Sequence, residues 1–446
     1  MIPRLSDRTI LYLFCCFLCV VLNYAIGAFS PSSTFDLRAR FYGARALLHG
    51  RTPYQAAVVL QELAADKTGP AHTDPLAMQR EYQETYPPTT LVLLAPFALL
   101  PWNVAQPIWV VLSGGSLALA GFLIFKTAFG NASITASLCS WVIANCAFVL
   151  CLGNPAALSV AAAVIAVWCL IEERFATLGV ILLALSLAIK PQDAGFPWLF
   201  LLLAGGTLLR RRTLQSLGLI LLLAVPSALW MTRVSPHWPS VIAQNVAFYS
   251  QPGAINDVGP DLPISSELFP KINLQTDLAI LWNNSIFYSS ITYITVGALF
   301  LALVLLARRV TNVRLRLWFG LACAVPLEML VSYHRTFDAK LLLLSIPACA
   351  QLWDRGGARR WLSASLTGLA LFVTGDIPLG IQNLFIDPLI DLRGSWPQRI
   401  LGILAGRPFP LILLALAVFY ILVLAQEAKA EEAQSLDSEA IAEVAT

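Results

Sequence analysis

The chain has 446 residues, of which 58% are hydrophobic and 12% are charged, and its formal net charge is +3. Soluble domains carry about 25% charged residues, so this sequence cannot build a water-facing surface. The net charge is too small to suggest a nucleic-acid partner. Apolar runs of about 20 residues favour membrane-spanning helices over the short alternating strands of a barrel. The composition therefore predicts an all-α polytopic membrane protein.

The first apolar run covers residues 10–29 and follows Arg4 and Arg8, an arrangement similar to a secretory signal. A cleaved signal has an apolar core of about 7 to 15 residues, and this run is longer. We therefore expect a retained anchor with a cytoplasmic N-terminus. Residues 31–87 then form a large first extracytoplasmic loop.

The first loop begins with a predicted helix over residues 35–48, which Ser33 or Thr34 can cap and Gly50 can close. Its apolar stripe consists of Leu37, Phe41, Ala44 and Leu48. A helix with one apolar stripe and charged residues on its other faces is expected to lie along the membrane surface.

Asp36 lies in the first turn of this helix, near the outer mouth of the first anchor, and Arg40 follows four residues later. One interpretation is structural, because a carboxylate is favourable in a first helical turn and can pair with Arg40. The other is chemical: an acid at this place can act as a general base.

The far end of the loop reads Tyr86-Pro87-Pro88, which predicts a stiff extended return to the membrane. Tyr54 and Tyr86 lie at the expected interface. Aromatic residues there are usually belt residues, and stacking on a carbohydrate is the alternative interpretation.

Arginine-rich turns on alternate sides of the apolar runs predict about twelve crossings with both termini cytoplasmic. The crossings are expected at residues 10–29, 103–125, 133–152, 155–171, 176–189, 196–209, 214–231, 286–307, 317–331, 340–352, 362–378 and 400–424. Residues 89–100 are expected to form a partial or interfacial helix, and residues 232–284 a second long outer loop. The whole of 1–425 is expected to be one domain, followed by a disordered tail at 426–446.

Lys190 lies between two apolar runs at a predicted outer end, where no basic cluster surrounds it. A polyprenyl phosphate would present an anion at this depth, and a lysine suits it as a compact charge. Snorkelling to the interface is the structural alternative.

The segment Tyr333-His334-Arg335-Thr336-Phe337-Asp338 places three ionisable side chains at a helix junction between apolar runs. Such groups are costly in a membrane unless they pair or function. His334 and Asp338 can bond each other, and Arg335 can bind a phosphate. Asn154, in Gly153-Asn154-Pro155, marks another outer turn and can offer its amide to a substrate.

Metal chemistry is not expected from the sequence. All nine cysteines lie in or beside apolar runs, where they are expected to be packing residues, and no CxxC pair occurs. The four histidines are scattered without an HExxH pattern. We therefore expect neither a metal nor another cofactor.

These elements, in order, resemble a known family. The pattern D-x-x-A-R-F-Y-G-A-R-A-L-L-H-G-R-T-P-Y from Asp36, followed by Y-P-P, G-N-P, A-I-K-P and Y-H-R-T-F-D, is similar to the glycosyltransferase 87 family of GT-C-type membrane enzymes. The likeness covers about residues 36–347. This family includes polyprenol-phosphate-mannose-dependent α-mannosyltransferases of bacterial envelopes.

The resemblance implies a GT-C-type bundle in which Asp36 is the catalytic base, while Lys190 and His334 contact the donor phosphate. Many members have Gly-Gln before Asn, where this chain has Gly153-Asn154-Pro155, so the role of Asn154 does not carry over directly. We also expect Arg335 at the phosphate, and Arg40, Tyr54, Tyr86 and Asp338 as further substrate contacts.

The expected partners are a polyprenyl-phosphate sugar donor, a glycolipid or glycan acceptor, and the lipid bilayer. The expected location is the plasma (inner) membrane, with the active site on its extracytoplasmic side. A transporter or flippase of lipid-linked or anionic solutes would use the same intramembrane charges and is the alternative. A third possibility is a structural partner in an envelope-assembly complex.

Overall fold

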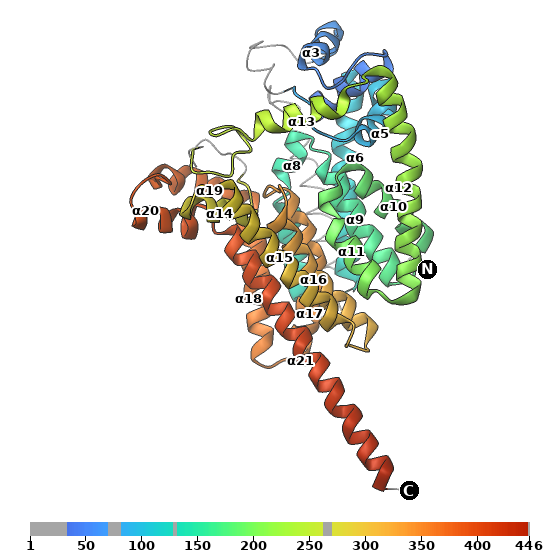
Figure 1. Cartoon of the computed structure of the whole chain (residues 1–446). Coiled ribbons are helices and arrows are strands. Elements are labelled where there is room, and N and C mark those ends of the chain that lie inside the picture. The colour runs from blue at the N-terminus through green and yellow to red at the C-terminus, as the bar shows by residue number, and fades with distance from the viewer. Residues whose placement is uncertain (1–33, 70–81, 128–131, 262–269, 445–446) are drawn as a thin grey trace.

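The computed structural model describes residues 34–69, 82–127, 132–261 and 270–444. The structure is 79% helix. The described residues contain no β-strand beyond one isolated bridge between Lys271 and Arg335. The predicted all-α class is thereby confirmed (Figure 1). The first predicted crossing, at residues 10–29, lies outside the described residues.

The first half of the chain supplies α2 (Phe35–Leu48), α3 (Ala56–Ala65), α5 (Pro88–Ala98), α6 (Trp102–Thr127), α7 (Ala132–Ala144), α8 (Ala147–Leu152), α9 (Ala156–Ile171), α10 (Ala176–Ile189), α11 (Gly195–Ala204) and α12 (Gly206–Val234). The second half supplies α13 (Trp238–Tyr249), α14 (Leu274–Leu281), α15 (Ser285–Ala307), α16 (Val313–Val331), α17 (Ile346–Arg355), α18 (Ala358–Val373), α19 (Asp376–Phe385), α20 (Trp396–Leu401) and α21 (Phe409–Val444). Short 3₁₀ turns are η1 (Pro191–Asp193), η3 (Asp338–Ser345) and η4 (Asp387–Leu389), and η5 (Gly402–Gly406) is a π-helix.

Two helices, α9 and α16, form the centre of the bundle. Most of their residues are buried, which is expected of helices that are apolar on every side. α9 packs against α6 and α10, while α16 packs against α11, α15 and α21. Polar junctions next to these central helices are therefore enclosed by apolar packing.

Among the residues that the structure describes, five helices are long and apolar enough to cross a membrane, or six if the bent pair α18 and α19 counts as one span. The five are Trp102–Thr127, Ile134–Leu152, Gly206–Val234, Ser285–Ala307 and Phe409–Gln434. The predicted number of about twelve crossings is not confirmed. Each apolar run was counted as one crossing, but α9, α10 and α11 have 16, 14 and 10 residues. A span of the hydrocarbon core needs about 20 residues.

The helix that carries Asp36 has the predicted bounds, but its environment differs from the prediction. α2 packs against α3 and α5, and nine of its residues are buried, so it does not lie open on a membrane surface. Thr34 adopts a left-handed conformation and its side chain makes no capping bond; its hydroxyl instead accepts from Gln106 at 2.9 Å. Ser33 lies outside the described residues.

A partly buried ion pair fixes α2 to the rest of this helical cap. Arg45 at the end of α2 donates to Asp66 at 2.6 Å, and the hydroxyl of Tyr42 donates to the same carboxylate at 3.2 Å. Burial raises the pKa of Asp66, but hydrogen bonds from Thr68 and Arg45 lower it by more, so the net shift is downward. The cap is therefore held by a carboxylate that is charged in the folded state.

The C-terminal tail continues as helix. α21 extends from Phe409 to Val444, so residues 426–444 of the expected tail belong to a helix. Figure 1 shows this helix projecting beyond the bundle, at the end away from α2 and α3.

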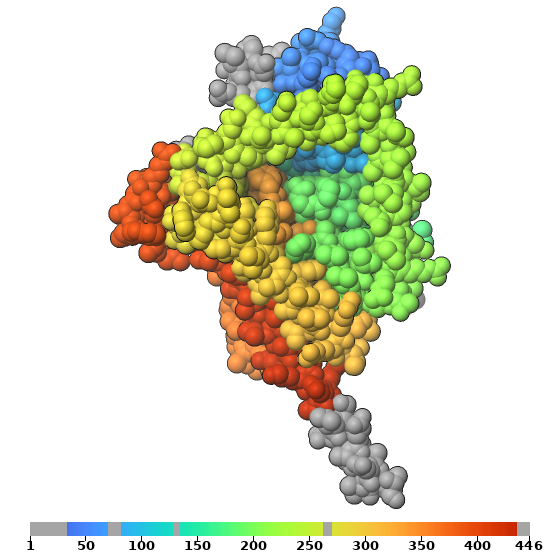
Figure 2. Space-filling view, in the orientation of Figure 1, coloured from blue at the N-terminus to red at the C-terminus, as the bar shows by residue number. Residues whose placement is uncertain are grey.

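The second predicted loop contains α13 and α14 and forms a strap across the bundle. Asn245 of α13 donates to the carbonyl oxygens of Tyr54 at 3.0 Å and Glu84 at 2.9 Å, so the strap is fixed to the first loop. Figure 2 shows a hollow beneath this strap, and segments from the first and last thirds of the chain are visible in its depth. The strap therefore borders an opening between segments far apart in the sequence.

Candidate active site

Asp36 is held by an asparagine from the central part of the chain. The amide of Asn154 donates to Asp36 Oδ2 at 2.6 Å, while its own Oδ1 accepts from the backbone N–H of Ala156 at 2.8 Å. Asn154 is thus fixed by the first turn of α9 and is itself buried. The side chain of Asp36 keeps 19% exposure, so it remains reachable. This is the arrangement of an oriented, accessible carboxylate.

Gly153 allows α2 to approach this turn. It adopts a φ of +63°, which L-residues rarely adopt, and a Cβ there would lie 2.8 Å from the Cβ of Leu37. The indole of Trp109 donates to its carbonyl at 2.9 Å. Because Leu37 follows Asp36 directly, Gly153 sets the distance between the acid and Asn154.

Tyr86 and Arg40 complete the surroundings of Asp36. The hydroxyl of Tyr86 donates to Asn154 Oδ1 at 3.2 Å, and the guanidinium of Arg40 lies 4.7 Å from the centre of the Tyr86 ring. Arg40 is also 3.6 Å from the Asp36 carboxylate and 3.5 Å from that of Glu84. Glu84 is buried and accepts from the backbone N–H of Tyr86 at 2.8 Å. Arg40 and Glu84 therefore fix the position of Tyr86.

The Tyr86-Pro87-Pro88 turn places this group on top of α10. The hydroxyls of Thr89 and Thr90 donate to the carbonyls of Ala188 and Ile189, at 2.5 and 2.7 Å. These are among the last residues of α10, immediately before Lys190. The predicted return of the loop to the membrane is thus anchored beside the predicted phosphate-binding lysine.

Tyr54 supports the site from behind. It is buried, its hydroxyl donates to the carbonyl of Tyr86 at 3.1 Å, and its ring stacks on Trp238 with centroids 6.3 Å apart. Burial raises its pKa, as expected of an enclosed phenol. The structure gives Tyr54 contacts that hold the loop, rather than a surface open to a sugar.

Lys190 lies buried between two carboxylates. Its ammonium group hydrogen-bonds Asp338 Oδ1 and is 3.3 Å from Asp193 Oδ1. It is not turned toward an exposed interface, so the snorkelling alternative does not describe it. Both carboxylates are buried, and such ions are tolerated inside a protein when they are paired.

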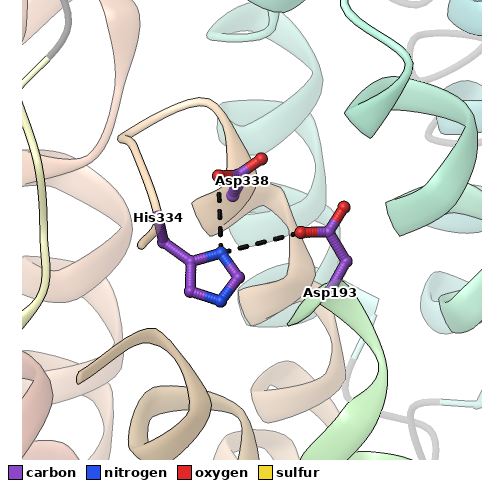
Figure 3. Close-up of side chains that lie close together, drawn as sticks. All are labelled: Asp193, His334 and Asp338. Atoms are coloured by element: carbon purple, nitrogen blue, oxygen red, sulfur yellow. Dashed lines mark hydrogen bonds and ion pairs between the residues drawn. The ribbon is translucent and has the colours of Figure 1, made fainter. Parts of the chain in front are cut away.

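His334 faces the same two carboxylates (Figure 3). Its Nδ1 is 3.4 Å from Asp338 Oδ2 and 3.6 Å from Asp193 Oδ1. The predicted contact between His334 and Asp338 is therefore present. Lys190, Asp193, His334 and Asp338 come from two junctions about 145 residues apart in sequence and form one buried cluster, here called the charged cluster.

Three members of the charged cluster have the spacing of metal ligands. One ligand atom each from Asp193, His334 and Asp338 lies within 4.8 Å of the others. A carboxylate–imidazole set of this kind suits a divalent ion. The ammonium of Lys190, however, already lies against both carboxylates and supplies positive charge between them. The expectation of a metal-free site stays a prediction.

Arg335 ties the charged cluster to the strap. Its guanidinium donates to the carbonyl of Ile255 at 2.9 Å and to Asn256 Oδ1 at 3.0 Å, and its backbone N–H donates to Asp338 Oδ2 at 3.0 Å. It also bonds the hydroxyl of Tyr333. The predicted phosphate-binding arginine thus contacts both the strap and the junction that carries His334.

Tyr86 connects the two groups of predicted site residues. Burial raises the pKa of its phenol; Lys190 and Arg40 oppose this shift, while Asp36 and Asp338 add to it. Charges of both groups therefore act on one hydroxyl. Tyr86 also hydrogen-bonds the asparagine that holds Asp36. That the acid of the first loop and the distant charged cluster line one site stays a prediction.

Two residues of this region were not singled out from the sequence. Glu84 lies in the loop just before Tyr86-Pro87-Pro88, and Asp193 lies three residues after Lys190. The i, i+3 spacing of Lys190 and Asp193 was a usable signal for an ion pair. Nothing local marks Glu84, because its partner Arg40 is 44 residues away in the sequence.

Comparison with known proteins gives the chemical class. Residues 85–256 match the family model described as Glycosyltransferase family 87. The matched segment contains Tyr86, Asn154, Lys190 and Asp193, together with α13 of the strap. No match to the chain was found among curated proteins or among solved structures. Over these residues the chain is similar to glycosyltransferase family 87, and the match supports a glycosyltransferase, consistent with a GT-C-type membrane enzyme.

Proposed function

We propose that this glycosyltransferase moves a hexose, specifically mannose, from a polyprenyl-phosphate donor to a cell-envelope glycolipid or glycan. Its location would be the plasma membrane, with the site on the extracytoplasmic side. The observation that carries the proposal is the oriented, reachable carboxylate of Asp36, held by Asn154. The return of its loop is anchored on the last residues of α10, immediately before the buried cation Lys190. Neither the family match nor the geometry of the described site favours the transporter alternative.

In the proposed reaction, Asp36 accepts the proton of an acceptor hydroxyl while the hydroxyl oxygen attacks the anomeric carbon. The bond between that carbon and the phosphate oxygen breaks, so the anomeric configuration is inverted and polyprenyl phosphate leaves. The hydrogen bond from Asn154 keeps the Asp36 carboxylate aimed at the hydroxyl. Substrate positioning of this kind accounts for much of an enzymatic rate enhancement.

Lys190 would stabilise the departing phosphate. An ammonium has three N–H donors, and two face Asp338 and Asp193, which leaves one for a phosphate oxygen. Its charge is fixed before the donor arrives, so little reorganisation is needed when negative charge develops. His334, held by the same carboxylates, is the second group placed to contact the phosphate.

The test is transfer of a radiolabelled hexose from a polyprenyl-phosphate donor to envelope lipids by the purified protein in proteoliposomes. Asp36→Asn should lower the rate by about 10²- to 10⁴-fold, the usual contribution of a general base. Arg40 should keep its place in this variant, because it also bonds the Asp36 carbonyl at 3.1 Å and approaches Glu84.

The matched control is Asp66→Asn, which removes a different carboxylate that pairs with an arginine of α2. Its rate per folded molecule should stay within a few fold of the wild type. Equal rates for Asp36→Asn and Asp66→Asn would remove Asp36 from the mechanism. A product with the anomeric configuration of the donor would exclude single displacement.

A further inference from the structure

α18 and α21 are joined by a lobe built from α19, η4, α20 and η5, residues 376–406, here called the lateral lobe. It follows α18 after a bend of 63° at the Thr374–Gly375 break. α18 has 16 residues, a length of about 24 Å at 1.5 Å per residue, against a hydrocarbon core of about 30 Å. If α18 enters the membrane at its first turn, the bend falls inside the hydrocarbon.

The polar groups at the bend have hydrogen-bond partners within the protein, which a position inside the hydrocarbon requires. Lys340 donates to the carbonyl of Thr374 at 3.1 Å and to Asp376 Oδ1 at 3.2 Å. The side chain of Asn145 accepts from the backbone N–H of Ile377 at 2.9 Å. Helix breaks are tolerated in a membrane when neighbouring protein groups bond the freed backbone atoms. The bend is therefore built into the fold by side chains from two other segments.

α19 buries polar side chains and exposes apolar ones, the reverse of a helix on the surface of a water-soluble protein. Its buried residues are Asp376, Leu379 and Gln382, two of which are polar. Its exposed large side chains are Ile377, Ile381, Leu384 and Phe385, spaced i, i+4, i+7 and i+8, and Leu384 is 73% exposed. One face of the helix is thus apolar and outward.

The exposed apolar surface continues through the rest of the lateral lobe. Leu389 is 74% exposed, and the remaining exposed large hydrophobic residues are Ile386, Trp396, Ile400, Leu401 and Leu404. Monomeric water-soluble proteins rarely expose a contiguous patch of this kind. Figure 2 shows the lobe projecting sideways from the bundle. The face needs an apolar environment.

The surroundings of the lobe indicate which environment that is. Leu301 is an exposed apolar residue of α15, which meets the length and hydropathy of a membrane span. Phe372 is exposed near the end of α18, which meets them together with the first part of the lobe, so we take the lobe to continue a lipid-facing surface. Asp376 accepts from the backbone N–H of Phe148 at 2.7 Å, in the helix that leads to Asn154. The lobe therefore lies at the level of the active site.

We propose that the lateral lobe is half-inserted, with its exposed apolar face among the acyl chains of the leaflet on the active-site side. The occupant of this face is lipid, not water and not a second protein. Amphipathic segments that bury an apolar face at the edge of the acyl chains bind membranes in this way. The inference rests on the bend, the polarity and the burial of the lobe, and does not depend on the proposed sugar or donor.

The test uses the full-length wild-type protein in proteoliposomes. One sample is labelled with a lipid-soluble aryl-diazirine carbene probe and another with hydroxyl radicals in the aqueous phase, and modified residues are located by mass spectrometry. Leu222 on α12, 70% exposed in a candidate span, is the lipid reference. Lys67, exposed in the turn after α3, is the water reference.

The expected result is carbene labelling of Leu384, Phe385 and Leu389 to the same extent as Leu222, with radical oxidation far below that of Lys67. Labelling that follows the Lys67 pattern would overturn the proposal, since the face would then be in water. Protection from both reagents would also overturn it, because a protein would then cover the face.

Discussion

Substituting Gly153 by alanine tests whether the separation of α2 and the Asn154 turn controls catalysis. A left-handed conformation costs an L-residue about 1–2 kcal/mol. The new Cβ would lie 2.8 Å from the Cβ of Leu37, and ordinary contact begins at 3.4 Å, so α2 must retreat by about 0.6 Å. Rotation of the Leu37 side chain cannot relieve a contact made by its Cβ. Overpacking of this kind adds about 1–3 kcal/mol.

Gly50 provides a matched control. Its φ is +71°, and a Cβ there meets nothing within 4 Å. Gly50→Ala should therefore cost about 1–2 kcal/mol from the backbone alone. Gly153→Ala should cost about 2–5 kcal/mol, because the same backbone cost is joined by the contact with Leu37.

The two variants should differ more in rate than in stability. Because Asp36 precedes Leu37, the retreat of α2 moves the carboxylate away from Asn154, and misplacement by about 1 Å can cost about 10²-fold in rate. The assay is the initial rate of hexose transfer per folded molecule, with thermal unfolding measured on the same samples. Equal rates and equal unfolding temperatures for Gly153→Ala and Gly50→Ala would refute the role given to this contact.

Three further predictions follow from buried charges. Lys190→Ala should raise the donor KM and destabilise the fold by about 3–5 kcal/mol, because it strands two carboxylates; an unchanged donor KM in the folded fraction would reject the phosphate role. Lys340 and Asp376 form a buried ion pair. Lys340→Met or Asp376→Asn alone should destabilise the fold more than the two substitutions together, since only the single variants leave an uncompensated charge. A double-mutant cycle on unfolding temperatures measures this difference. The folded-state pKa of Asp66 is lowered, so the ionised carboxylate stabilises the fold above about pH 4. This stabilisation is lost as the pH falls through the folded-state pKa. The difference in unfolding temperature between wild type and Asp66→Asn should therefore shrink over that pH interval.

The predictions from sequence were most successful where the signal was local. The bounds of α2 and the pairing of Asp36 with Arg40 follow from helical spacing and turn residues within 14 positions. The contact between His334 and Asp338 is likewise an i, i+4 pair. A single sequence shows such relations directly, because one turn of helix fixes which side chains are neighbours.

The described residues do not confirm the count of about twelve crossings, because hydropathy does not show where a helix ends inside the bundle. α10 stops at Lys190, and Pro191 begins a 3₁₀ turn whose Asp193 returns to the lysine. In composition, an apolar run that ends at a paired charge inside the bundle cannot be distinguished from a short membrane span. The burial of α2 was missed for a related reason: the residues that cover it, on α5, belong to a run that was assigned to the interface.

The two carboxylates beside Lys190 suggest why a membrane enzyme would keep a cation next to two acids. An isolated ammonium in a low-dielectric interior tends to lose its proton, and a neutral amine could not hold a phosphate. Asp338 and Asp193 favour the charged form of Lys190 before any donor arrives. The same acids weaken the attraction of the cluster for a phosphate that stays bound. In the proposed reaction, polyprenyl phosphate must leave after every transfer. Such a site gains from both effects, since catalysis requires stronger binding of the transition state than of the product.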